Sequence, residues 1–106
     1  MIIQVNSDDH ITNTGEFIKK VSSEAEDTLK RFKNHISRLE IHFADENKGK
    51  KGVEDKKCTI ELRLNSHHPE AVSYKADTLD AAFKGAIDKA KHLVITKVDQ
   101  MKEHRN

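Results

Sequence analysis

The sequence predicts a single α+β domain spanning residues 1–106, with strands and helices in the order β-α-β-β-β-α. Two long segments repeat apolar residues every third or fourth position, and four short segments alternate apolar with polar residues. The two strands that flank the first helix should be parallel, because such crossovers are right-handed, and the remaining strands should form an antiparallel meander. We therefore expect a four-stranded mixed sheet with both helices packed on one face and a largely polar opposite face.

The first strand and helix are predicted from the start of the chain. Ile3 and Val5 alternate with polar neighbours, which is typical of a short strand. A helix should run from about Gly15 to Lys33, after a capping residue in the 12–14 segment whose side-chain oxygen accepts from a free backbone amide. Lys20 and Glu24 are spaced to pair along it, as are Asp27 and Arg31. Its apolar stripe comprises Ile18, Val21, Ala25, Leu29, Phe32 and Ile36.

The middle of the chain predicts three more strands, at 39–43, 58–64 and 72–76. The lysine-rich segment 44–57 is expected to be a mobile loop, and 65–69 a hairpin connection. In the last strand, Val72, Tyr74 and Ala76 alternate with Ser73 and Lys75, so the three share one side of the strand.

A second, longer helix follows, with Asp77 or Thr78 as its cap. Its apolar stripe persists for about six turns, so this helix should lie along the whole sheet. The residues expected to be buried are Leu79, Ala82, Phe83, Ala86, Ile87, Ala90, Val94, Val98 and Met101.

The net charge, the cysteine count and the lack of long apolar runs exclude several classes of protein. The net charge of +1, from 19 basic and 18 acidic residues, argues against a protein that coats nucleic acid non-specifically, although a basic face backed by an acidic one is compatible with it. The single cysteine, Cys58, forms no intramolecular disulfide, which suggests a reducing compartment. With no signal peptide and no apolar run near the roughly 20 residues of a membrane span, we expect a cytoplasmic protein that does not contact membranes.

Neither a metal site nor a catalytic site is expected. Zinc needs three or four converging ligands, whereas adjacent histidines in a hairpin diverge. Cys58 is in register with apolar strand positions and is expected to be a core residue rather than a nucleophile. The glycines are too scattered for a phosphate loop. We therefore predict no enzyme, no cofactor and no small-molecule substrate. The histidines and acids considered as ligands are His67, His68, His10, Asp8 and Asp9.

Basic side chains lie off the apolar stripes of both helices. One interpretation is a solvated surface with interspersed carboxylates. The other is a phosphate-binding surface, because flexible ammonium groups suit phosphates as point charges. No strand face shows paired exposed aromatic residues, so bound RNA would be read by shape and backbone. The basic residues are Lys19, Lys30, Arg31 and Lys33 in the first helix and Lys84, Lys89, Lys91, His92 and Lys97 in the second.

Several stretches resemble the ribosome hibernation-promoting factor family, which includes ribosome-associated inhibitor A. They are Val5–Thr12, then Leu29–Phe32 with Ile36 and the strand at 39–43, and finally Ala81-Ala82 with Ile87-Asp88-Lys89. The resemblance covers essentially the whole chain and is to the short form of the family, without a C-terminal dimerisation domain. Each motif is degenerate.

The resemblance implies a fold like a double-stranded-RNA-binding domain. It also implies binding in the decoding channel of the small ribosomal subunit, where occupancy blocks translation and preserves idle ribosomes during stress. We expect such a protein to be a monomer. Carried over by position, the RNA-binding residues would be Lys30, Arg31, Lys33, Lys84, Lys89, Lys91, His92 and Lys97.

The chain also departs from the family pattern, in ways that weaken the basic surface. Asp80 stands where a tyrosine is common, His92-Leu93 replace an Arg-Gln element, and Ile95-Thr96 stand where more basic or polar groups are usual. The alternative is a protein-interaction module that kept the fold and lost ribosome binding, with contacts through the sheet face or the end of the second helix. The loop lysines could serve either RNA binding or solubility; they are Lys48, Lys50, Lys51, Lys56 and Lys57.

Overall fold

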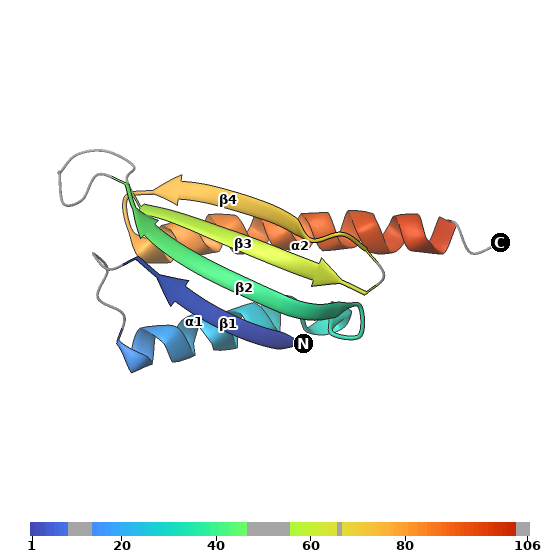
Figure 1. Ribbon diagram of the computed structural model, residues 1–106, viewed down its shortest axis with the longest axis horizontal. Coiled ribbons are helices and arrows are strands. Elements are labelled where there is room, and N and C mark those ends of the chain that lie inside the picture. Colours follow the sequence, from blue (N-terminus) through green and yellow to red (C-terminus); the bar gives the residue numbers. More distant parts are fainter. Residues whose placement is uncertain (9–13, 47–55, 66, 104–106) are drawn as a thin grey trace.

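The computed structural model describes residues 1–8, 14–46, 56–65 and 67–103, and confirms the α+β fold (Figure 1). The strand-helix order agrees with the prediction, apart from a short 3₁₀ helix that precedes the second strand. The elements are β1 Ile2–Ser7, α1 Gly15–Thr28, the 3₁₀ helix η1 Lys30–Phe32, β2 Ile36–Asp45, β3 Lys56–Leu64, β4 Glu70–Ala76 and α2 Leu79–Glu103.

The sheet is mixed, as predicted, with the strand order β1-β2-β3-β4. β1 is parallel to β2, with Val5 opposite Ile41, and the other two pairs are antiparallel. α1 and α2 lie side by side on the same face of the sheet (Figure 1). No described helix covers the other face, where the exposed or half-buried side chains of β2 and β3 include Arg38, Glu40, Glu61 and Arg63. The two faces of the sheet therefore offer very different surfaces.

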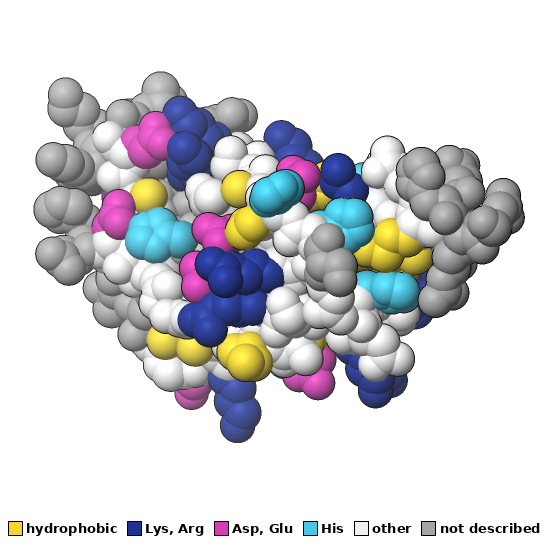
Figure 2. Space-filling model, turned by 45° about the vertical axis from the view of Figure 1, so that its right-hand side comes forward, with side chains coloured by type: hydrophobic (Ala, Val, Ile, Leu, Met, Phe, Trp, Pro, Cys, Tyr) yellow, Lys and Arg dark blue, Asp and Glu magenta, His cyan; other side chains and the backbone are white. Residues whose placement is uncertain are grey.

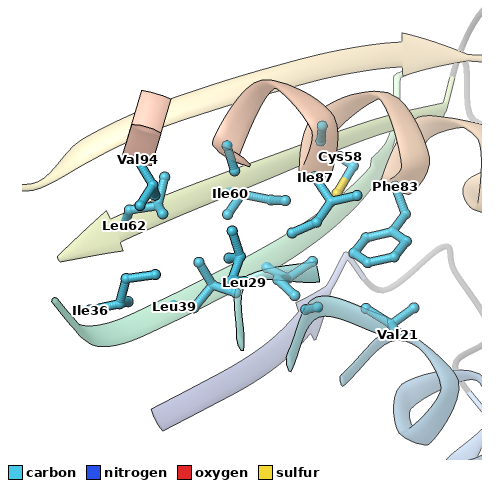
Figure 3. Close-up of a cluster of buried hydrophobic side chains, with 14 of the residues drawn as sticks. Val21, Leu29, Ile36, Leu39, Cys58, Ile60, Leu62, Phe83, Ile87 and Val94 are labelled. Atoms are coloured by element: carbon cyan, nitrogen blue, oxygen red, sulfur yellow. The ribbon is translucent and has the colours of Figure 1, made fainter. Parts of the chain in front are cut away.

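The core lies between the sheet and the two helices (Figure 3). Alternate residues of β2 and β3 point toward the helices, as the period of a strand requires. Val21 of α1 and Phe83 of α2 meet them from the other side. The buried side chains of the two central strands include Leu39, Ile41, Phe43, Cys58, Ile60 and Leu62, each with no exposed surface.

Threonine caps begin both helices. The Thr14 hydroxyl accepts a hydrogen bond from the Phe17 amide at 3.1 Å, and the Thr78 hydroxyl accepts from the Ala81 amide at 3.1 Å. Each cap satisfies one of the amides that the first turn of a helix leaves unpaired.

The predicted end of the first helix is wrong. α1 ends at Thr28, and the chain continues as a 3₁₀ turn in which the Phe32 amide donates to the Leu29 carbonyl at 2.9 Å. Leu29 and Phe32 are both buried. A 3₁₀ turn places residues three apart on one side, so it keeps both in the core while the chain turns toward Ile36. Ile36 is then buried as the first residue of β2 rather than as part of a helix.

The loop predicted at 44–57 is shorter than expected, because the strands on both sides are longer. The register of β2 and β3 continues to Asp45 opposite Lys56, whose side chains form an ion pair at 3.2 Å. Residues 47–55, with Lys48, Lys50 and Lys51, lie outside the described residues. No described helix is long and apolar enough to span a bilayer.

Candidate nucleic-acid interface

Three of the predicted RNA-binding residues lie at the end of α1. Lys30 and Arg31 belong to η1, Lys33 follows it, and all three are exposed. The Arg31 guanidinium lies 5.5 Å from the centre of the Phe32 ring, so its stem is held against the domain. Lys30 and Lys33 line a shallow hollow that also includes Glu26. The same hollow also includes Asp27, so this end of the helix offers three cations together with two nearby carboxylates.

Asp80 joins the two helices near the start of α2. Its carboxylate accepts from Lys20 of α1 and pairs with Lys84 of α2, each at 3.3 Å. The helical spacing had suggested a pair between Lys20 and Glu24. In the structure Lys20 pairs with Asp80 instead. Desolvation of the Asp80 carboxylate raises its pKa, but the hydrogen bonds and charges of Lys84 and Lys20 outweigh this effect, and the pKa is lowered overall.

Lys84 and Lys91 lie on the flank of α2 that faces α1. They are seven residues apart, which is two helical turns, so they share one side of the helix. The contact between Lys20 and Asp80 identifies this side as the one next to α1. Lys91 is half-buried, whereas His92 is exposed and lies 3.7 Å from the Asp88 carboxylate.

Lys89 and Lys97 turn to the opposite flank of α2, toward the edge strand β4. The Lys89 ammonium donates to the Ser73 carbonyl at 3.0 Å, and Lys97 forms an ion pair with Glu70 at 3.4 Å. The structure therefore does not bring all eight predicted residues together. It divides them between the end of α1, the α1-facing and outer sides of α2, and the β4 edge.

Tyr74 is exposed, which the sequence did not predict. Its side chain is on the helix side of β4, but it is 42 % exposed because β4 is an edge strand and only α2 lies beneath it. A Cβ placed on Gly85 would overlap three carbons of the Tyr74 ring, namely Cγ, Cδ2 and Cε2. Lys89 lies 5.5 Å from the centre of the same ring. A glycine in the interior of an amphipathic helix is the sequence signal for such a close approach.

The open face of the sheet carries mixed charge. Arg38 pairs with Glu40 at 2.8 Å, and the register places Arg38 opposite Arg63 and Glu40 opposite Glu61. Basic and acidic side chains accordingly lie next to one another in Figure 2 rather than in separate areas. Such a surface lacks the concentrated positive charge that phosphate backbones require.

The described residues offer no group suited to catalysis by a thiolate or a bound metal. Cys58 is fully buried, which confirms its predicted place in the core, and burial raises the pKa of its thiol to about 12. Among the described residues, no three His, Cys, Asp or Glu side chains gather into a metal-binding group. His10 and Asp9 lie outside the described residues.

Comparison with known proteins identifies the fold. No family model matches the sequence, and no curated protein matches it. The structure is similar to the crystal structure of the N-terminal domain of Protein Y from Thermus thermophilus, with a TM-score of 0.70, 16% identity, and coverage of 89% of this chain and 96% of that one. It is also similar to a ribosomal subunit interface protein from Coxiella burnetii, with a TM-score of 0.69, 14% identity, and coverage of 93% and 99%.

Proposed function

We propose that this protein is a ribosome-associated factor that binds the small ribosomal subunit and silences translation by occupying the decoding channel. The observation that carries the proposal is the likeness of nearly the whole chain to solved structures, one of which is described as a ribosomal subunit interface protein. The local resemblance to hibernation-promoting factors, stated above, supports the same function. Such a factor acts in the cytoplasm and needs no cofactor.

The helix side of the domain is the surface that we assign to ribosomal RNA. It combines the cations at the end of α1 with Lys84, Lys91 and His92 of α2. Lysine and arginine bind phosphates without reading the bases, and the release of counterions from the RNA makes this binding steeply dependent on salt. Inhibition then requires only steric occupancy and no covalent chemistry. Lys89 and Lys97 can contribute only by giving up their contacts with Ser73 and Glu70.

Co-sedimentation with purified small ribosomal subunits at low and high salt tests this proposal. We expect near-stoichiometric binding at low salt that weakens steeply as salt rises. The variant Lys30→Glu/Lys84→Glu/Lys91→Glu should lose binding. The matched control is Arg38→Glu/Lys57→Glu/Arg63→Glu, which makes the same change of charge on the open sheet face and should bind like the wild type.

Two results would contradict the proposal. Retained co-sedimentation of the helix-side variant would overturn the assignment of the surface. Absence of binding by the wild type, even at low salt, would overturn ribosome association itself. Circular dichroism and thermal unfolding of each variant establish that the comparison is between folded proteins.

A second candidate is a protein-interaction module with the same fold. The observation in its favour is that several predicted RNA-binding cations already face carboxylates: Lys84 faces Asp80, His92 faces Asp88 and Lys97 faces Glu70. This neutralisation agrees with a net charge of only +1. Failure to bind subunits, together with self-association in analytical ultracentrifugation or a partner that binds the purified protein, would favour this function.

A further inference from the structure

The exposed ring of Tyr74 borders a hollow between the end of β4 and the first turns of α2. The hollow is lined by Tyr74, Gly85 and Thr78, and by the charged residues Lys75, Lys84, Asp77 and Asp88. Tyr74 is the only tyrosine in the chain, and the sequence contains no tryptophan. With 42 % of its surface exposed, Tyr74 is one of only two large apolar side chains so exposed among the described residues.

The ring is held in place before any ligand arrives. One part of the ring lies directly against the backbone of α2, where only a glycine leaves enough room. The Lys89 ammonium lies near the ring and is itself held by the Ser73 carbonyl. An aromatic side chain fixed in this way loses little conformational freedom when a second ring stacks on it, so the hollow has a preorganised platform.

The charged groups around the platform fit a nucleotide. Aromatic side chains stack on bases with little dependence on sequence, because every base has a π face. Lys84 pairs with Asp80 at 3.3 Å and Lys75 pairs with Glu46 at 2.8 Å. Each of these flexible ammonium groups can meet a phosphate beside the stacked base by exchanging its carboxylate for that phosphate. Asp77 and Asp88 only accept hydrogen bonds, so they suit the exocyclic amino groups of adenine, cytosine or guanine better than uracil.

We propose that the hollow between β4 and α2 binds one unpaired nucleotide of an RNA strand, with its base stacked on Tyr74 and the adjoining phosphates on Lys75 and Lys84. The proposal rests on the proposed ribosomal function and deepens it. It adds a base-stacking contact to a surface for which the sequence predicted recognition of shape and backbone alone. The amino-bearing bases adenine, cytosine and guanine are the expected occupants, rather than uracil.

The fluorescence of the single tyrosine provides the test. We expect a ten-residue oligoadenylate to quench the tyrosine emission of the full chain in a saturable, salt-sensitive manner, because stacking on Tyr74 affects the only emitter. Free AMP should require a much higher concentration, since it lacks the second phosphate contact, and oligouridylate should bind more weakly. N-acetyl-tyrosinamide at matched absorbance corrects for light absorbed by the oligonucleotide.

Two substitutions separate the aromatic ring of Tyr74 from its hydroxyl group. Binding of a labelled oligoadenylate, followed by fluorescence anisotropy, should weaken about tenfold in Tyr74→Ala and remain unchanged in Tyr74→Phe, which keeps the aromatic face. Thermal unfolding shows whether Tyr74→Ala is folded. Unchanged affinity in folded Tyr74→Ala, or binding of the oligonucleotide without quenching, would overturn the proposal. Equal affinity for AMP would also overturn it and assign the hollow to free mononucleotides.

The subunit experiment distinguishes failure of this inference from failure of the proposed function. Wild-type protein that binds small subunits but not oligoadenylate would overturn only the stacking site. Wild-type protein that binds oligoadenylate with quenching but does not bind subunits would support the stacking site and overturn the ribosomal function.

Discussion

The ring of Tyr74 lies against the backbone of Gly85, and this contact between β4 and α2 leaves no room for a larger residue at position 85. Gly85 is in the interior of α2, where glycine is unfavourable compared with alanine. The absence of a side chain at position 85 allows the aromatic ring of the edge strand to pack closely against the helix. The same contact holds the ring in the position that makes it a stacking platform.

The first prediction is that Gly85→Ala destabilises the protein although alanine is the better helix former. The new methyl group would overlap ring carbons near the root of the Tyr74 side chain, so the ring or the β4 backbone must move. In a Tyr74→Ala background the same substitution should instead stabilise, by up to about 1 kcal/mol, because only helix propensity remains. Urea unfolding of wild type, the two single variants and the double variant measures the effect of Gly85→Ala with and without the Tyr74 ring. If the effects of the two substitutions simply add, the two residues do not touch.

The second prediction concerns Lys89, which shields the free edge of β4. Replacing Lys89 with methionine keeps the apolar stem and removes both the hydrogen bond to the Ser73 carbonyl and the charge beside Tyr74. We expect the free energy of unfolding to fall by about 0.5–1.5 kcal/mol. Lys91→Met is the matched control, since the structure shows no such bond for Lys91 among the described residues, and it should change stability far less. Equal effects of the two substitutions would mean that the edge contact contributes nothing.

The fold could be predicted from the sequence because apolar residues alternate clearly in the strands and recur every third or fourth position in the helices. The alternation in β2 and β3 corresponds to buried residues, and so does the stripe of α2 except at its ends, where Leu79 and Met101 are only half-buried. The end of α1 was missed for a physical reason: Leu29 and Phe32 continue the helical spacing, and a 3₁₀ turn satisfies that spacing equally well. The exposure of Tyr74 was not predictable, because alternation identifies the side of a strand and does not show whether an edge strand is fully covered.

The sequence predicted which basic residues the candidate site contains, but not how they are arranged in space. The sequence identifies which lysines avoid the apolar stripes, but not which carboxylate each one meets. Lys20 illustrates this limit, because its nearest acid in the helical sequence is Glu24, whereas folding brings it to Asp80, sixty residues away. Lys89 and Lys97 show the same limit, since the backbone and side-chain partners that hold them belong to β4.

The third prediction is a dependence of stability on Asp80 at acidic pH. Because the pKa of Asp80 is lowered in the folded protein, its ion pairs stabilise the fold above the ordinary aspartate pKa, and this contribution disappears as pH falls through the folded value. Near neutral pH, Asp80→Asn should cost roughly 0.2–1 kcal/mol, because the pairs are solvent-exposed and screened. That difference should vanish in acid and shrink at high salt.

Urea unfolding of wild type and Asp80→Asn from neutral pH down to the acid limit of stability measures this effect. Asp99→Asn is the control on the same helix, because the structure shows no ion pair for Asp99 among the described residues, and it should follow the wild type at every pH. A difference between wild type and Asp80→Asn that stays constant with pH would show that the ion pairs with Lys20 and Lys84 do not form in solution.

The last prediction is that the Cys58 thiol is inert in the folded protein. Its side chain is fully buried among the residues of β3, and burial raises its pKa to about 12, so roughly one molecule in ten thousand carries a thiolate at pH 8. A thiol reagent such as Ellman's reagent should therefore react only when the domain opens. With one cysteine in the chain, the kinetics report this site alone. We expect native protein to react orders of magnitude more slowly than protein in urea, and equal rates would place Cys58 at the surface and contradict the packing of β3 against α2.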